Sequence, residues 1–577
     1  MRHTISLSPF AFSTLIFFSL ASCSFKKNSS FTTFGNDSAA KIPPTAVSEV
    51  PETTGFFLNE WQAKTFTAPE YSDVVSPASA NSTVTIDAGS VITKIPSPVF
   101  GHNANVWMTR MIDQPALLTH LSNLKPHVIR FPAGSGSNRY FWNRREGDLP
   151  ADVPEMIMDK DGIVKEPGYF YGKGNYHSHA SLDDYYAVLN KTGSQGMITV
   201  NYGYARYGTS KDPVATAAHL AADWVRYDKG RTPYWEIGNE NFADWENGYR
   251  IDLSKNKDGQ PEFLTGDLYA RHFKVFADSM RKAAAEIGKT IYIGAVMFET
   301  KPESFRADIF KTWNTTMLPA LKGTNDYYVL HNYFTPYRQN TNATAILTAA
   351  GTVPGSMMRF AQKQIKTFGG TEKPIALTEW NMFAEGSKQQ VSNVSGLFSV
   401  IVQGEAIKHK YGMAGRWDLL NAWSGGDDHG LFSDGKEPGV TKWSPRPSFY
   451  YMYYFQKTIG DRLVGSSSTA KSLKTYASTY SSGELAVAVV NTATRAQKVK
   501  LKIKNFSPGR RMYWYSLEGG SDNGEFSRKV SVNRVTTKAV AGGPENYTSI
   551  KANSSLTSDS MRVEVPARGT IFLVVEK

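Results

Sequence analysis

The chain has 577 residues, which is too long for one average domain and long enough for a large catalytic domain with a smaller companion. Hydrophobic residues make up 41% and charged residues 20% of it, a balance that excludes wholesale disorder. Its formal net charge of +12 comes from scattered lysines and arginines without a run of five like charges, so we expect no nucleic-acid partner. An acidic polysaccharide or a negatively charged cell surface fits this charge better, and a merely soluble surface is the simplest meaning.

Residues 1–22 have the pattern of an export signal. Arg2 is followed by an apolar run from Phe10 to Leu20, which is too short and wrongly flanked for a membrane-spanning helix. The run ends in Leu20-Ala21-Ser22-Cys23, which resembles the bacterial lipobox, and Cys23 is the only cysteine of the sequence. We therefore expect lipidation at Cys23 and a protein of the bacterial cell envelope, at the outer membrane, that meets the membrane only through this anchor. The alternative is a plain secretory signal with a chance cysteine.

Residues 23–80 are rich in Ser, Thr, Ala and Pro and show no sustained period, which predicts a tether. From residue 81 to about residue 460, short apolar strands alternate with amphipathic helical patterns, as in repeated βα units. Eight strand exits can be counted, at FGHN (to Asn103), HVIRFP (to Pro132), MITVNYG (to Gly203), YWEIGNE (to Glu240), IYIGAVM (to Met297), YYVLHNY (to Tyr333), PIALTEW (to Trp380) and GRWDLLNAW (to Trp423).

Two helices between these strands have clear signals. Asp212-Pro213 supplies an N-cap and a proline at the first helical position, and a second helix is expected from Asp267 to Ile287, ended by Gly288. Eight strands with intervening helices predict an α/β fold, a (β/α)₈ TIM barrel over residues 81–460. The long second loop, residues 132–197, is crowded with aromatic side chains and is either functional or a packed cap. After residue 460, alternating strands such as ELAVAVVNTA and KVKLKIKNF predict a C-terminal antiparallel β-sandwich over residues 461–577.

Two glutamates occupy matching positions at strand exits. Glu240 follows the fourth strand and Glu379 belongs to the exit of the seventh, so both should point over one barrel mouth. Two facing carboxyl groups are what glycoside hydrolysis requires, because one must donate a proton to the leaving oxygen while the other attacks or stabilises the sugar cation. Either glutamate alone is more often a solvated strand end.

These motifs resemble those of clan A glycoside hydrolases, which carry Asn-Glu after the fourth strand and a second Glu after the seventh. The resemblance covers roughly residues 82 to 577 and implies acid/base work for Glu240 and nucleophilic attack by Glu379. Within the clan, FGHN, VNYG and WEIGNEN look most like α-L-arabinofuranosidase-type enzymes and the heparanase-like group. The resemblance also implies substrate-binding or supporting roles for further positions: Asn103, Arg130, Asn201, Asn239, His331, Tyr333 and Trp423.

The physical roles follow from these positions. Asn239 can bond the sugar 2-hydroxyl, while Arg130 and Tyr333 should depress the pKa of Glu379 and that of Glu240 should be raised. Each support residue has a plainer alternative, such as a structural ion pair for Arg130 or a core position for Trp423. Asp427-Asp428-His429 has too few partners for a metal cage, so we expect no metal and no cofactor.

The sequence thus predicts a retaining glycoside hydrolase with a carbohydrate substrate, an α-L-arabinofuranosidase or an enzyme on an acidic or algal glycan. It leaves open the sugar, the linkage, exo or endo action and the oligomeric state. An inverting mechanism also stays open until the separation of the two carboxyl groups is known. The competing hypothesis is a non-catalytic, glycan-binding surface lipoprotein built on the same barrel.

Overall fold

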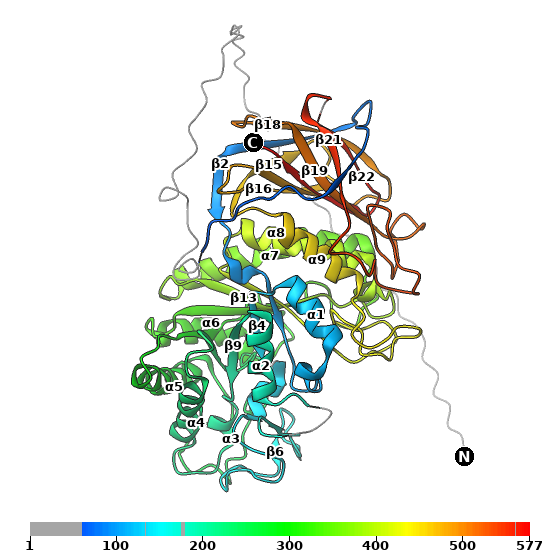
Figure 1. Cartoon of the computed structure of the whole chain (residues 1–577). Helices are drawn as coiled ribbons and strands as arrows, with labels where there is room; N and C mark the ends of the chain where they lie inside the picture. Colours follow the sequence, from blue (N-terminus) through cyan, green and yellow to red (C-terminus); the bar gives the residue numbers. More distant parts are fainter. Residues whose placement is uncertain (1–60, 133, 175–178, 560) are drawn as a thin grey trace, which may run out of the picture. The chain divides into compact units, whose positions relative to one another are not determined.

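The computed structural model describes residues 61–132, 134–174, 179–559 and 561–577 (Figure 1). The predicted signal peptide, Cys23 and the tether up to residue 60 lie outside the described residues. No helix in these ranges is both long enough and apolar enough to cross a membrane.

Within the described residues, eight parallel strands close into a barrel in the order β10-β11-β12-β13-β14-β3-β4-β9. The predicted TIM barrel is confirmed. Seven of the strands end within four residues of the expected exits, and the eighth ends earlier than expected. The strands are β3 (Gly101–Asn103), β4 (Val128–Phe131), β9 (Gln195–Val200), β10 (Tyr234–Ile237), β11 (Tyr292–Val296), β12 (Tyr327–Asn332), β13 (Ile375–Trp380) and β14 (Met413–Arg416).

Helices follow the strands in the expected alternation. Asp212 caps α4 through its side chain, which accepts a hydrogen bond from the Ala215 N–H, and Pro213 opens the helix as predicted. The cap of α5 is Thr265, two residues before the expected start. The helices are α1 (Pro115–Leu124), α2 (Leu182–Thr192), α3 (Tyr204–Tyr207), α4 (Pro213–Asp228), α5 (Gly266–Glu286), α6 (Asp308–Leu321), α7 (Ala343–Thr367), α8 (Asn393–Lys408) and α9 (Pro447–Thr458).

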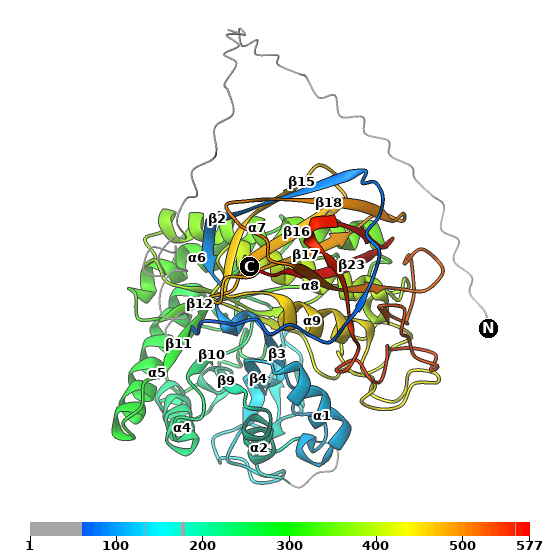
Figure 2. The ribbon, with the colours of Figure 1, turned by 45° about the horizontal axis from the view of Figure 1, so that its top comes forward.

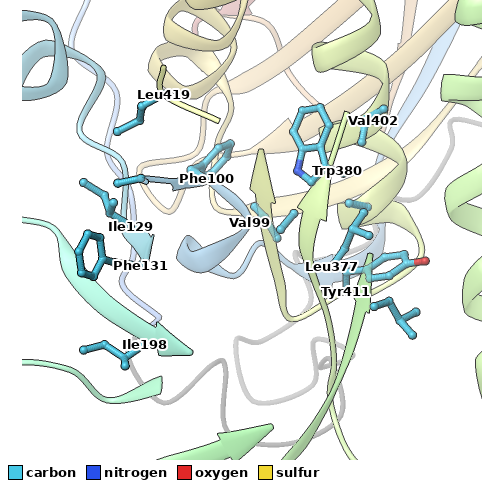
Figure 3. Packing of buried hydrophobic residues seen from close by; sticks show 14 of the residues in the cluster. Val99, Phe100, Ile129, Phe131, Ile198, Leu377, Trp380, Val402, Tyr411 and Leu419 are labelled. Atoms are coloured by element: carbon cyan, nitrogen blue, oxygen red, sulfur yellow. The ribbon is translucent and has the colours of Figure 1, made fainter. Parts of the chain in front are cut away.

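Along most of each barrel strand the side chains alternate between two environments, because successive side chains of a strand point to opposite faces. Register shifts interrupt this pattern in β13, where the neighbouring Thr378 and Glu379 both bond residues of the site. Outward side chains form the large core between strands and helices. Figure 3 shows part of it, including Phe131 of β4, Ile198 of β9, Trp380 of β13 and Val402 of α8. Inward side chains fill the amino-terminal half of the barrel with a small apolar cluster: Val128, Met197, Tyr234, Tyr327, Val329, Ala376 and Met413. Toward the carboxyl ends of the strands the inward side chains become polar, and this change sets the position of the site.

The second domain is a mixed sheet of 11 strands in the described part of the chain. Most neighbours pair antiparallel, as predicted, but β18 runs parallel to β2 and β1 runs parallel to β21. The strands are β1 (Tyr71–Asp73), β2 (Ser82–Lys94), β15 (Arg462–Ser468), β16 (Leu473–Thr479), β17 (Leu485–Asn491), β18 (Gln497–Lys504), β19 (Arg511–Glu518), β20 (Ser531–Val532), β21 (Ala552–Leu556), β22 (Arg562–Val565) and β23 (Gly569–Val575). Their inward side chains, among them Val84, Val487 and Leu501, form a second core.

The structure corrects the predicted boundary at residue 81. Strand β2 belongs to the sheet domain, where it lies between β15 and β18 (Figure 2), so the barrel begins only at β3. Part of the predicted tether also joins this domain. Strand β1 pairs with β21, and the Lys64 ammonium donates to the carbonyl oxygens of Gln456 in the last turn of α9 and of Ile459 just after the helix, at 2.8 and 2.5 Å. The local pattern of residues 61–94 could not reveal these partners, because they come from the other end of the chain.

Smaller elements occupy the long loop after β4. Within its described residues, a 3₁₀ helix (Gly134–Arg139) leads into two short strand pairs, β5 (Tyr140–Phe141) with β8 (Phe170–Tyr171) and β6 (Ile157–Met158) with β7 (Val164–Lys165). The Phe141 ring packs edge-on against Tyr169 and Tyr204. Tyr140, Phe141 and Trp142 are buried, which favours the packed-cap alternative for this loop in its described residues.

Candidate active site

Glu240 and Glu379 meet at the carboxyl end of the barrel, as the sequence predicts. Glu379 is the fifth residue of β13 and is buried, while Glu240 lies in the turn after β10 and keeps 16% of its side chain exposed. One oxygen of each carboxyl group and one ring nitrogen of His331 all lie within 4.8 Å of one another. The two carboxyl groups therefore share one small space.

The turn after β10 places Glu240 through two left-handed residues. Gly238 has φ +77°, and Glu240 itself has φ +45°, a region that non-glycine residues seldom adopt. A side chain at Gly238 would collide with the Asn241 amide oxygen, which lies 2.0 Å from the position of its Cβ. The glycine that ends the strand is therefore required by both the backbone and the packing of the turn.

Arg130 is the centre of the site. Its guanidinium donates from Nε to Glu236 at 2.6 Å, from Nη1 to Glu379 at 3.2 Å and from Nη2 to the Asn239 amide oxygen at 2.9 Å. Nη1 also reaches the amide oxygen of Asn103 at 3.0 Å. A planar guanidinium bound on all edges is held in one orientation, so Arg130 fixes the position of Glu379 and presents a permanent positive charge to it.

His331 bridges the two glutamates. Its Nδ1 lies 3.0 Å from Glu240 Oε1 and 3.4 Å from Glu379 Oε2, and its Nε2 lies 3.1 Å from the Thr378 hydroxyl. Burial lowers the pKa of His331, so the ring is neutral. A neutral ring then donates from Nδ1 to the carboxyl pair and accepts the Thr378 proton at Nε2. Tyr333 completes this side, with its hydroxyl 3.4 Å from Glu379 Oε2 and its ring stacked on Phe383.

Burial governs the acidity of the pair. It raises the pKa of Glu240 to about 7, against the opposing charge of Arg130, and it raises the pKa of Glu379 to about 7, against His331 and Arg130. The expected depression of the Glu379 pKa is therefore wrong, because loss of hydration outweighs the attraction of the cation. Two coupled carboxyl groups at this distance share a proton near neutral pH, and the direct contact with Arg130 makes Glu379 the group that ionises first.

The other predicted site residues fall into two groups. Asn103 and Asn239 belong to the Arg130 network, and the Asn103 Nδ2 donates to the carbonyl oxygens of Thr378 and Gly415. Asn201 lies in a neighbouring network instead, where it accepts from the Tyr204 N–H at 3.0 Å and donates to the Tyr207 hydroxyl at 3.1 Å.

Trp423 does not lie at the end of the eighth strand. Strand β14 ends at Arg416, and Trp423 is a half-buried loop residue with the Arg446 guanidinium 6.0 Å from its ring. The aromatic residue directly after β14 is Trp417, whose indole contacts Gly134 in the loop after β4 and the ring of Trp107. The sequence GRWDLLNAW contains both tryptophans, and only the strand's end decides which of them is at the exit.

Three acidic residues of the site were missed. Glu236 faces into the barrel, since it is two residues from the inward Tyr234, and this alternation was the signal that could have found it. Glu246 binds the Asn239 amide at 3.3 Å and the Asn138 amide at 2.7 Å. Glu299 accepts a hydrogen bond from Asn332 at 2.8 Å. Burial raises the pKa of both Glu246 and Glu299 to about 7.

Exposed aromatic side chains stand on the loops around the pair. Trp245 is 49% exposed, hydrogen-bonds Glu240 and packs against Phe310. Phe305 and Tyr337 are 76% and 63% exposed, and Tyr337 packs against Phe383, which in turn stacks on Tyr333. Aromatic faces of this kind are surfaces on which sugar rings stack.

Glu240, His331 and Glu379 are also the one group among the described residues whose donor atoms could bind a metal ion. The positive charge of Arg130 disfavours a metal ion at this position. Its charge already lies 3.2 Å from Glu379, and a second cation at the same carboxylate would be repelled by it.

The sequence matches no family model and no curated protein. Among solved structures, the α-L-arabinofuranosidase of Thermotoga maritima in its arabinose complex matches with a TM-score of 0.60 and 17% identity, over 86% of this chain and 100% of that chain. The GH51 α-L-arabinofuranosidase of Thermotoga petrophila matches with a TM-score of 0.60 and 18% identity, again over 86% of this chain and 100% of that chain. A family 44 xyloglucanase of Paenibacillus polymyxa matches with a TM-score of 0.54 and 12% identity, over 86% of this chain and 99% of that chain. The chain therefore has the fold of the clan A glycoside hydrolases.

Proposed function

We propose that the protein is a retaining glycoside hydrolase. The observation that carries the proposal is the separation of the two glutamates, whose nearest oxygens lie within 4.8 Å. Retaining enzymes hold their carboxyl groups about 5–5.5 Å apart so that one can attack the sugar directly, whereas inverting enzymes need about 6.5–9.5 Å to admit a water molecule. The glycoside hydrolases among the solved structures of this fold support the same reaction class.

The proposed reaction has two displacements. The Glu379 carboxylate attacks the anomeric carbon, the bond to the leaving oxygen breaks, and Glu240 gives its proton to that oxygen. Glu240, now ionised, removes a proton from a water molecule, whose oxygen displaces Glu379 from the sugar. Arg130 and Tyr333 keep Glu379 positioned and favour its ionised form, while the burial of Glu240 keeps it protonated at the start of each cycle.

Asn239 is placed for recognition of the sugar. Arg130 holds its amide oxygen and Glu246 holds its Nδ2, so the amide cannot flip between its two orientations. An amide fixed beside the nucleophile suits a bond to the sugar 2-hydroxyl, which strengthens as positive charge develops at the anomeric carbon.

We propose α-L-arabinofuranosides as the first substrate to test, because the solved structures of this fold include several arabinofuranosidases. The exposed Trp245, Phe305 and Tyr337 support a substrate that continues beyond one sugar, such as a polysaccharide.

The test is hydrolysis of aryl glycosides and plant and algal polysaccharides by the wild type and by Glu240→Gln and Glu379→Gln. We expect both variants to lose at least about a thousandfold on polysaccharide. An aryl glycoside with an acidic phenol needs no proton donor, so Glu240→Gln should still release one equivalent of phenol in a burst and Glu379→Gln should not. Proton NMR of the first-formed sugar should show retained configuration.

Two outcomes contradict the proposal. Inverted configuration would exclude the double displacement. Tight glycan binding by the wild type without turnover of any member of a broad panel would support the glycan-binding surface protein instead.

We also propose that Cys23 carries a lipid and anchors the chain to the bacterial envelope, because the only cysteine stands at the end of a lipobox-like motif. Expression in a bacterial host followed by mass spectrometry of the amino-terminal peptide should find a diacylglyceryl adduct on Cys23, and Cys23→Ala should release the protein from the membrane fraction. An unmodified Cys23 peptide would contradict this.

A further inference from the structure

A regular row of lysines lies on the sheet domain, remote in sequence from the site. Strand β18 reads QKVKLKIK, with Val499 and Leu501 buried in the second core. Because side chains alternate along a strand, the four lysines of β18 all point to the opposite face, and each is exposed. We call this surface the lysine face, made of Lys498, Lys500, Lys502, Lys504 and Arg562. Its four lysines span roughly 20 Å, at about 3.3 Å per residue.

Protection of a sheet edge does not explain the whole row. Lysines often stand on edge strands, where they prevent pairing with another chain. Lys498 and Lys500 do not stand on a free edge, since residues 497–500 pair with β22 on one side and residues 499–504 pair with β2 on the other, so edge protection applies at most to Lys502 and Lys504. Threonine or valine would suit such a paired strand better than lysine.

The row also carries an electrostatic cost. Lys500 stands directly opposite Arg562 of β22, and like charges in directly opposite positions destabilise a strand pair. Two carboxylates stand beside the row, Glu564 opposite Lys498 and Asp87 opposite Lys504. Asp87 is engaged by the Asn505 amide at 2.7 Å. Five cations thus face two carboxylates, and within the described residues none of the four lysines forms an ion pair.

We propose that the lysine face binds a linear, negatively charged polysaccharide, carboxylated or sulfated. A straight row of cations complements a chain that carries anions at intervals, and Thr83 and Thr85 of the neighbouring strand place hydroxyl groups beside Lys500 and Lys502. The large hydrophobic residues that are exposed in the described chain lie on other segments, so this surface has nothing to insert into a lipid bilayer. In a use that rests on the proposed function, the lysine face would hold a polymer whose neutral branches the barrel cleaves. The binding of the polymer does not depend on the proposed function.

The test measures binding of the full chain to polygalacturonate, with neutral linear arabinan and phosphatidylglycerol vesicles as comparisons, by calorimetry at 50 and 200 mM salt. We expect the wild type to bind polygalacturonate and the variant K498Q/K500Q/K502Q/K504Q to bind at least tenfold more weakly. Raising the salt should weaken wild-type binding more than that of the variant, because the neutral face displaces fewer counterions from the polyanion.

A matched control removes four other exposed lysines, Lys274 and Lys282 of α5 and Lys363 and Lys366 of α7. This K274Q/K282Q/K363Q/K366Q variant loses the same net charge and should bind within twofold of the wild type. The melting temperature of the lysine-face variant should equal or exceed that of the wild type, since like charges are removed. A further measurement needs no mutation. Saturating polygalacturonate should protect the four lysines of the lysine face from acetylation, which mass spectrometry detects.

Three results would overturn the proposal. The first is an equal loss of affinity in both quadruple variants, which would assign binding to net charge alone. The second is binding to arabinan as tight as to polygalacturonate. The third is binding of the wild type to vesicles and not to polygalacturonate. Since no result here depends on hydrolysis, failure of this proposal and failure of the proposed function remain distinguishable.

Discussion

Glu240 shows, at the scale of one residue, how a site can oppose the stability of its own fold. Its carboxyl group is held in a left-handed turn, largely removed from water, within 4.8 Å of a second carboxyl group. The pKa of about 7 means that the folded protein holds a proton there that the unfolded chain has already released above pH 4.5. Stability contributed by that proton is present below pH 4.5 and is lost as the pH rises to about 7.

The change Glu240→Gln should therefore stabilise the protein at pH 8 and have little effect at pH 4.5. A pKa raised from 4.5 to about 7 corresponds to an upper limit of about 3 kcal/mol of unfolding free energy. Thermal or urea unfolding at the two pH values measures it. The exposed Glu372→Gln provides the control and should show no such difference. Equal stability of wild type and Glu240→Gln at pH 8 would mean that the carboxyl group is better hydrated than its burial indicates.

At the scale of the element, the turn after β10 places Glu240 beyond the end of the strand, at the carboxyl end of the barrel. The strand alternates Tyr234 and Glu236 inward, and the left-handed turn at Gly238 and Glu240 then brings the Glu240 carboxyl group to 3.0 Å from His331. The same alternation builds the Arg130 network from β3, β4 and β10. Strand pairing sets the register, with Asn103 opposite Arg130 and His331 opposite Glu379.

The change Gly238→Ala should disrupt this turn. The new methyl group would meet the Asn241 oxygen at 2.0 Å and would have to adopt φ +77°, so we expect a loss of roughly 2–3 kcal/mol or more and of most activity. Gly288→Ala is the matched control, since Gly288 has φ +64° but open space around it, and should cost only about 1 kcal/mol. Urea unfolding and initial rates measure both, and equal effects would show that the conformation alone matters.

At the scale of the molecule, the two ends of the chain build one domain. Strand β2 pairs with β15 and β18, and the sheet contacts the barrel through helices α8 and α9 (Figure 2). The Tyr476 hydroxyl bonds Glu405 of α8 at 3.0 Å, and Phe455 of α9 packs against Phe572 of β23. The sheet domain is therefore not a separate carboxyl-terminal module.

We expect residues 461–577 expressed alone to lack a cooperative unfolding transition, because β15 and β18 each lose a partner and the second core loses Val84 and Ile86. A fusion that appends residues 61–94 through a flexible linker should be more soluble and closer to cooperative. Circular dichroism during heating compares the two. Cooperative unfolding of residues 461–577 alone would show that β2 is dispensable.

Most of the barrel and the centre of the site could be predicted from the sequence. Strand exits are marked by local alternation and by turn residues, and eight exits of one barrel must meet at one end, so Glu240, Glu379, Arg130 and His331 were expected together. Glu236 was overlooked within an apolar stretch although the alternation marks it. Trp423 was misplaced because the end of β14 has no clear local signal.

The sequence by itself determined the alternation of strands and helices and the position of a glutamate at each of two matching strand exits, since each strand exit is marked by residues close together in the chain. Only the tertiary structure decided that β2 completes a sheet at the other end of the chain, that Trp417 rather than Trp423 stands at the eighth exit, and that the pKa of Glu379 is raised. The physical reason is that pairing over several hundred residues and the loss of hydration on burial depend on what surrounds a group in space.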